Sequence, residues 1–416
     1  MNPVKNFLIQ LLRAALSAVF VVLCSRWMGP EGRGELGLLL FWAGLLMVAN
    51  DYVGGSNLAN MLQRYKLNSL LPVCFGWALW TVAAAVAILW ISQPSAKSGL
   101  MLGLISLPLV LLSIIYNMQQ GLGMVQRRNG LQLLLEALKL VILAALFFKS
   151  RDLSLSVGTA VGALFYAMLV VLVIAIWQLR KHIFPAMLAP VKPPAELFSS
   201  GFWSQNGHLA QFLAYRLSLY TLTWFSGSHF QAGIYANALL IADTIWIFAN
   251  SFGTIAHVRI LRSSNSRFQA DITLRYAVFA LAGTTAACFA LVWVPSHWFT
   301  AVFGPGFESL KPTVILLIPS ILAVSASSLF SHYLHAVNRF KALFLANAGG
   351  LVLQTLLGVF LIPRLGIVGA CISANAGFAL VFLLVFLMFR QSNPGSRFQG
   401  TMRLKAMWRI LKQSLG

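Results

Sequence analysis

Arg216 is the side chain in this sequence whose presence needs the most explanation. It lies near the middle of QFLAYRLSLYTLTW (residues 211–224), an otherwise apolar segment of helical length. A charge at the centre of a membrane-inserted helix costs about 2.5–3.5 kcal/mol or more and marks a functional site by default. Guanidinium binds phosphate through paired hydrogen bonds. Two interpretations follow: Arg216 binds an anion, or Asp243 is its counter-ion in a structural ion pair.

Other polar residues recur at helical spacing in apolar segments. Gln205 and His208 precede Arg216 by eleven and eight residues, so the three share one helix face. We predict that substrate is bound by Arg216, Arg13, Lys139, Gln205 and His208. We predict roles in coupling, gating or charge compensation for Glu136, Asp243, Asn250 and Asp51. If the faces carrying Arg13 and Arg216 meet, the resulting cavity is basic and suits a phosphate-bearing substrate.

Several of these residues have a purely structural alternative. Glu136 and Lys139 are three residues apart and can pair on one helix. His208 can be a packed, hydrogen-bonded histidine, and Asp51 can lie at the membrane interface. Arg13 lies close to the start of its apolar segment, where its stem can carry the charge to the surface.

Motifs typical of enzymes are absent. The sequence contains no GxxxxGK[ST], HExxH, GxSxG or DxD pattern, and His332 with His335 lacks a third metal ligand. The four cysteines all fall in apolar segments without metal-ligand spacing. We therefore predict a protein that is not an enzyme and uses no cofactor and no metal.

The composition is that of an integral membrane protein. The chain has 416 residues, of which 59% are hydrophobic and 9% charged, and its mean hydropathy is +0.81. Soluble domains carry about 25% charged residues. In this context the net charge of +21 reflects basic cytoplasmic loops, not nucleic-acid binding. The first apolar run has no small-residue cleavage site, so we expect it to remain as a membrane helix.

Twelve apolar segments are long enough to cross a bilayer. They are residues 6–28, 36–54, 68–92, 99–119, 130–149, 156–178, 199–226, 231–256, 273–294, 312–335, 342–361 and 367–389. We predict an N-terminal six-helix lobe (1–180), a cytoplasmic linker made extended by its prolines (181–198), a C-terminal six-helix lobe (199–390) and a basic amphipathic tail (391–416). Such a tail suits the surface of an anionic membrane.

The Lys and Arg residues predict the orientation. With both termini in the cytoplasm, 20 of the 30 lie in cytoplasmic segments and 7, including Arg33, lie on the opposite side. Such an excess is typical of cytoplasmic loops. The two halves also resemble each other, since VANDYVG (48–54) and FANSFGT (248–254) occupy matching positions. A parallel repeat of two six-helix halves is a common transporter plan.

Four stretches resemble one transporter family. They are WMGPEGRGELGLL (27–39), AYRLSLYTLTWFSGSHFQAGIYANA (214–238), VFGPGFESLKPTVILL (302–317) and VNRFKALFLANAGGLVLQTLLGVFLIPRLGIVGACISA (337–374). The chain resembles bacterial polysaccharide flippases of the Wzx type, in the multidrug/oligosaccharidyl-lipid/polysaccharide (MOP) exporter superfamily, over essentially its whole length. In that family the arginine matching Arg216 is commonly followed two residues later by aspartate, whereas this chain has Ser218.

The resemblance implies an all-α polytopic membrane protein with twelve transmembrane helices in two lobes, a MATE-like V-shaped fold and short loops. It implies a transporter of the bacterial inner membrane that flips undecaprenyl-pyrophosphate-linked oligosaccharide for O-antigen or other surface polysaccharide assembly. Arg216 carries over to the family's cationic cavity, and Arg13 does so more loosely. Implied partners are the anionic lipid-linked substrate, membrane lipids and polysaccharide polymerase or assembly proteins.

Alternative functions remain open at this point. A cation or drug antiporter of the same superfamily would have carboxylates dominating its cavity. A noncatalytic membrane scaffold in glycan assembly would tolerate loss of Arg216. A membrane-embedded polymerase or transferase would need a catalytic loop, and a peptidoglycan-precursor flippase usually has additional helices.

Overall fold

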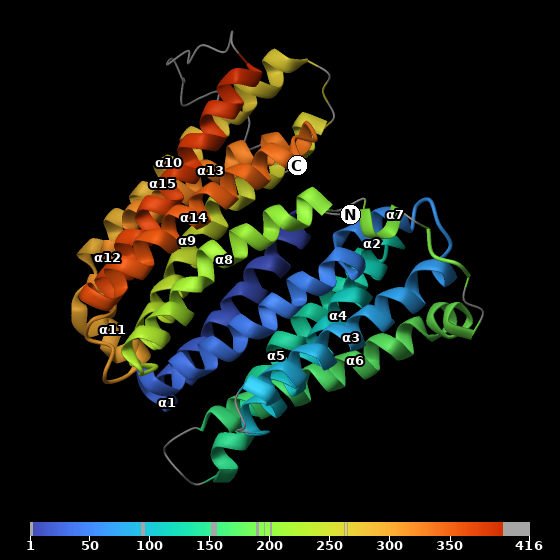
Figure 1. The fold of residues 1–416 in the computed structure, drawn as a ribbon, viewed down its shortest axis with the longest axis horizontal. Helices are drawn as coiled ribbons and strands as arrows, with labels where there is room; N and C mark the ends of the chain where they lie inside the picture. The colour runs from blue at the N-terminus through green and yellow to red at the C-terminus, as the bar shows by residue number, and fades with distance from the viewer. Residues whose placement is uncertain are drawn as a thin grey trace.

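The structure is a computed structural model and describes residues 3–92, 96–150, 156–188, 191–194, 196–199, 202–261, 263 and 265–393. Within these ranges all regular secondary structure is helical (Figure 1). The helices of the first half are α1 (Pro3–Gly54), α2 (Ser56–Met61), α3 (Leu67–Ser92), α4 (Ala96–Gly121), α5 (Val125–Ser150), α6 (Val157–Leu188) and α7 (Glu196–Ser199). Those of the second half are α8 (Phe202–Ser226), α9 (Phe230–Leu261), α10 (Ser266–Trp293), α11 (Ser296–Phe303), α12 (Leu310–Leu316), α13 (Ile318–Ala336), α14 (Phe340–Leu365) and α15 (Ile367–Ser392).

Helix α1 consists of two membrane-length limbs. Its apolar part, Ile9–Gly54, has 46 residues, which is about twice what a bilayer core requires. Gly29 divides it with φ 68° and ψ −177°, a backbone conformation that glycine adopts without strain. Pro30 follows and suits the first position of a helix. Figure 1 shows the α1 ribbon reversing direction at the lower left, so α1 supplies the first two predicted spans.

Within the described residues, nine helices are long and apolar enough to cross a membrane, or ten if the bent pair α12–α13 is one span. That pair is bent by 48°. Helix α8 has 25 residues but is too polar to be included by hydropathy. With α1 counted as two limbs and α8 added, each half contributes six membrane-length segments, as the sequence predicts.

The buried side chains form separate cores in the two halves. The core residues of the first half lie between Phe20 and Leu197, and those of the second half form two clusters between Ala214 and Phe389. Figure 1 shows the two groups of helices close together at the lower left and spread apart toward the upper right. We call the close end, which carries α11 and the α1 reversal, the turn end. The other end, which carries α2 and α7, is the linker end.

The predicted extended linker is wrong over most of its length. Helix α6 continues to Leu188, and only residues 191–194 are described as non-helical before α7 begins. The helix continues because Ile183 and Ala186 are buried, which outweighs the missing amide hydrogen of Pro185 near its end. Residues 394–416 of the predicted tail lie outside the described residues.

Two glycines allow the halves to meet at the turn end. A Cβ atom on Gly233 of α9 would lie 1.8 Å from the Pro30 carbonyl oxygen, and one on Gly34 of α1 would lie 2.0 Å from the His229 carbonyl oxygen. Small residues allow membrane helices to approach this closely. The Glu31 carboxylate accepts hydrogen bonds from the His229 amide at 2.9 Å and the Ser228 hydroxyl at 3.0 Å, beside the N-terminus of α9. A negative charge is favourable there.

We predict that Gly233→Ala destabilises the protein by about 1–3 kcal/mol, because the added methyl group overpacks the contact between α1 and α9. The melting temperature in detergent measures the effect. Gly76→Ala is the matched control, since a Cβ atom on Gly76 of α3 would meet nothing within 4 Å. Equal melting temperatures for the two variants would contradict the close approach of the halves.

Candidate functional site

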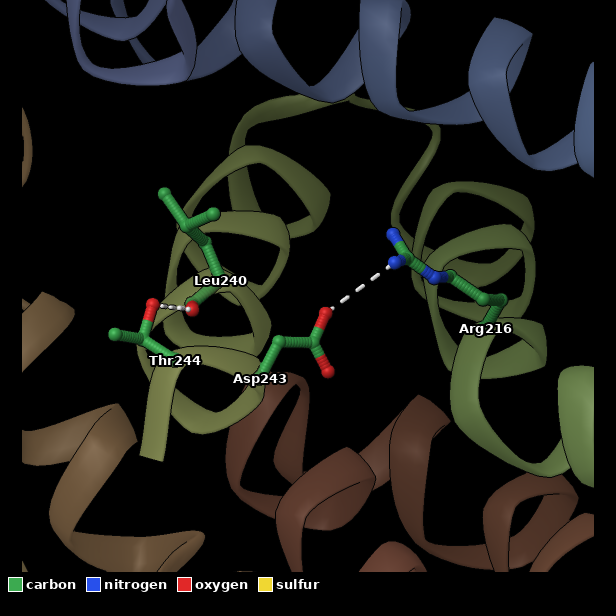
Figure 2. A network of polar contacts seen from close by, with 4 residues as sticks. All are labelled: Arg216, Leu240, Asp243 and Thr244. Carbon is green, nitrogen blue, oxygen red and sulfur yellow. Dashed lines mark hydrogen bonds and ion pairs between the residues drawn. The ribbon is translucent and has the colours of Figure 1, made fainter. Parts of the chain in front are cut away.

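Arg216 and Asp243 form an ion pair between neighbouring helices (Figure 2). Arg216 lies on α8 and Asp243 on α9, and only residues 227–229 separate these helices. The Arg216 Nη2 atom is 3.4 Å from the Asp243 Oδ2 atom. Thr244 beside them donates to the Leu240 carbonyl of its own helix at 2.9 Å. The counter-ion that the sequence suggested for Arg216 is therefore in place.

The ion pair remains accessible although it lies between helices. The side chains of Arg216 and Asp243 are 36% and 30% exposed. Figure 2 shows a ribbon of the N-terminal half on one side of the pair and ribbons of the C-terminal half on the other. Helix α1 packs against both α8 and α9. The pair is thus partly accessible at the place where the two halves meet.

A second guanidinium at this junction belongs to Arg33, which the sequence analysis placed in a loop. Arg33 is only 5% exposed, and its Nε atom donates to the Asn237 Oδ1 atom of α9 at 2.9 Å. The Ser25 hydroxyl donates to the same oxygen at 3.0 Å. Arg33 and Arg216 both contact α9, through Asn237 and Asp243. In the sequence, Arg33 lies three residues before Leu36, which is buried in the structure. The glycines around Arg33 indicated a turn, so its burial was not predicted.

Three predicted residues of the N-terminal half, Arg13, Glu136 and Lys139, make their polar contacts within that half. Arg13 of α1 donates to Gln10 and to Gln132 of α5. The Lys139 Nζ atom is 2.5 Å from the Glu136 Oε2 atom, which is the pairing that their spacing allowed. The second arginine that contacts α9 is therefore Arg33, whereas Arg13 forms hydrogen bonds within the N-terminal half.

The predicted polar face of α8 is divided among different neighbours. Gln205 is buried, with 4% of its surface exposed. His208 is exposed, and its ring centroid lies 5.8 Å from that of His335 on α13. The Phe212 ring stacks on Phe41 of α1 at 5.8 Å. These contacts separate Gln205 and His208 from the ion pair of Arg216.

The remaining predicted residues lie toward the linker end. Asp51 accepts a hydrogen bond from Ser113 of α4 at 3.2 Å. The Asn250 Oδ1 atom lies 3.0 Å from His332 Nε2, and the His332 carbonyl oxygen lies 3.1 Å from His257 Nδ1. His332 and His335 lie three residues apart on α13, so their contacts with His257 and His208 bring four histidines together. No group of three or more His, Cys, Asp or Glu residues in the described part of the chain is arranged to hold a metal ion.

The chemistry of this junction is electrostatic. Arg33, Arg216 and Asp243 together carry one net positive charge, and guanidinium offers paired donors to an oxyanion. An anion that approaches Arg216 competes with Asp243 for the same donors. The site therefore suits reversible binding of an anion, with Asp243 holding Arg216 when the anion is absent.

No protein-family profile and no curated protein sequence matches the chain. Solved structures do match in fold. A multidrug resistance MATE family transporter of the MOP superfamily, in an inward-facing conformation, has a TM-score of 0.74 at 14% identity, covering 92% of this chain and 96% of its own. The lipid II flippase MurJ, in an inward closed conformation, has a TM-score of 0.66 at 13% identity, covering 92% and 87%. The eukaryotic MATE transporter AtDTX14 has a TM-score of 0.57 at 13% identity, covering 93% of each.

At these identities the likeness establishes the fold. The chain is an all-helical, multi-pass membrane protein with the fold of MATE transporters and MurJ.

We predict that Asn237→Ala lowers the free energy of unfolding by roughly 1.5–3 kcal/mol, because it removes the acceptor of a buried charged donor. Thermal unfolding in detergent measures the effect. Asn237→Asp retains an acceptor for Arg33 and restores stability. Ser25→Ala is the matched control, because it removes a neutral donor to the same oxygen. A smaller loss for Asn237→Ala than for Ser25→Ala would contradict the role given to Arg33.

Proposed function

We propose that this protein is a flippase that moves undecaprenyl-pyrophosphate-linked oligosaccharide across the bacterial inner membrane by alternating access, for surface polysaccharide assembly. The observation that carries the proposal is the accessible Arg216–Asp243 pair beside the buried Arg33, where the two halves meet. Moving a phosphate through hydrocarbon without compensation is prohibitively costly. Two guanidiniums at the junction lower that cost for an anion.

A lipid-linked substrate is supported by two further points. One structure of the same fold is that of the lipid II flippase MurJ. The sequence motifs resemble those of polysaccharide flippases in particular. The excess of Lys and Arg in the segments at the linker end supports a cytoplasmic location for that end and for both termini. The proposed partners are membrane lipids and polysaccharide polymerase or assembly proteins.

In the mechanism that we propose, the two halves move as rigid bodies because each has its own apolar core. The pyrophosphate displaces Asp243 from Arg216 while the oligosaccharide stays in the accessible space and the polyprenyl chain remains in lipid. At the turn end the closed state is held by Glu31 on the α9 N-terminus and by Arg33 on Asn237. Breaking these contacts separates the halves at that end and releases the head group on the other side of the membrane.

A cation or drug antiporter is the second candidate. The accessible carboxylate of Asp243 favours it, as does the multidrug transporter among the structures of the same fold. In that case Asp243 binds the cation and Arg216 holds the carboxylate ready. The two candidate functions differ in the residue that binds the substrate: a flippase requires Arg216, and a cation antiporter requires Asp243.

We predict that Arg216→Ala in the native host causes lipid-linked oligosaccharide to accumulate inside the cell and reduces surface polysaccharide. The expected loss is about tenfold or more, because a charge-assisted hydrogen bond contributes roughly 1.5–3 kcal/mol. Extraction of the lipid-linked intermediate and quantification of surface glycan measure both quantities, after normal membrane abundance of the variant has been verified.

Arg275→Ala is the matched control, because Arg275 pairs with Asp271 at 2.8 Å on the surface of α10. It is expected to leave both quantities unchanged. Asp243→Asn, which keeps an acceptor near Arg216, is expected to retain more flux than Arg216→Ala. Normal glycan export with Arg216→Ala, together with lost cation efflux in Asp243→Asn, would favour the antiporter. Normal phenotypes for both variants would leave the pair with a structural role.

A further inference from the structure

A pocket of about 380 Å³ lies between the start of α5 and the last part of α6, on different helices from the ion pair. It is lined by Arg127, Trp177, Gln178, Arg180 and Lys181. Figure 1 shows α6 along the outer edge of the N-terminal helices, and Trp177, Arg180 and Lys181 of this helix are exposed.

The positive charge of the pocket is not compensated by protein carboxylates. Among the described residues, no salt bridge involves Arg127, Arg180 or Lys181. Arg127 contacts the Met124 sulfur at 3.9 Å, and the Arg180 guanidinium lies 4.9 Å from the centre of the Trp177 ring. Three cations at one pocket favour an anion with several oxygens, such as a phosphate or diphosphate.

One neutral group in the pocket also lacks a partner. The Gln178 Oε1 atom is buried and accepts no hydrogen bond from the protein. A buried acceptor without a donor is costly. Rotation of the Gln178 side chain toward the pocket would let this oxygen accept a hydrogen bond from a ligand hydroxyl group, such as that of glycerol or a sugar, while the phosphate contacts the three basic side chains.

A lipid-facing stripe leads along α6 to this pocket. Tyr166, Val170, Val173 and Trp177 follow one another at intervals of four, three and four residues and therefore share one helix face. Their side chains are 52%, 42%, 60% and 64% exposed on a helix that is apolar enough to span the membrane. Trp177 ends the stripe where the basic residues begin, and tryptophan prefers the membrane interface.

We propose that the pocket between α5 and α6 binds the phosphate-bearing head group of a membrane lipid, with the lipid chain lying along the α6 stripe. Basic pockets between membrane helices on the cytoplasmic side are suited to anionic lipid head groups. The lipid chain would contact the exposed apolar stripe of α6, and the phosphate would contact the three basic side chains. This proposal does not depend on the function assigned to Arg216.

The test is native mass spectrometry of the full-length protein released from phosphatidylcholine nanodiscs. The nanodiscs contain phosphatidylglycerol or undecaprenyl diphosphate, and a third series adds inorganic pyrophosphate instead. The variant Arg127→Gln/Arg180→Gln/Lys181→Gln is expected to bind the phosphate-bearing lipid about a hundredfold more weakly, since each basic side chain contributes roughly fivefold. Arg180→Gln alone is expected to weaken binding about fivefold.

A charge-matched control variant separates this site from other sources of binding. Arg64→Gln/Lys66→Gln/Arg339→Gln removes three exposed positive charges elsewhere and is expected to bind lipid like the wild type. Preferential retention of phosphatidylglycerol identifies a phospholipid site, and preferential retention of undecaprenyl diphosphate identifies a polyprenyl lipid site; both support the proposal.

Three results would overturn the proposal. The first is unchanged lipid binding in the triple variant of the pocket. The second is an equal loss in the charge-matched control, which would mean that only the overall charge matters. The third is binding of inorganic pyrophosphate as tight as that of undecaprenyl diphosphate, which would exclude a contribution from the lipid chain.

Discussion

The backbone contact between α1 and α9 at Gly34 and Gly233 is the constraint on which the rest of the junction depends. Because no side chain separates the helices there, polar groups of one half reach backbone and side chains of the other. Glu31 reaches the N-terminus of α9, and Arg33 reaches Asn237. The contact is built from hydrogen bonds and small residues, and the two halves keep separate apolar cores. It can therefore be broken without unfolding either half.

Charge at the junction is arranged differently from what the family resemblance implied. The position two residues after Arg216 holds Ser218, which is buried and accepts a hydrogen bond from Gln354 at 3.3 Å. The carboxylate comes from the next helix, at Asp243. A partner on another helix depends on how α8 and α9 pack, whereas a partner on the same helix does not. The strength of the Arg216 pair is therefore linked to the position of α9.

The sequence predicts the number of membrane-length helices and offers the Arg216–Asp243 pair as one of two interpretations, because hydropathy and the cost of a charge in lipid are local properties. It does not predict that Arg33 is buried, since burial there results from a crossing of α1 and α9 that only the tertiary structure defines. Helical spacing on α8 also did not predict which residues form one site. His208 lies near His335 of α13, whereas Phe212, on the same helix face, stacks on Phe41 of α1. The proline-rich linker was misassigned because burial of Ile183 outweighed a local preference.

The polarity of α8 has a consequence for biosynthesis. Of the long helices in the described residues, α8 is the one that carries an ionised arginine at mid-span and is not identified as a span by hydropathy. Its charge is compensated only when Asp243, on the following helix, is present. Insertion of α8 together with α9 as a hairpin therefore avoids the cost of an unpaired arginine in the bilayer, about 2.5–3.5 kcal/mol.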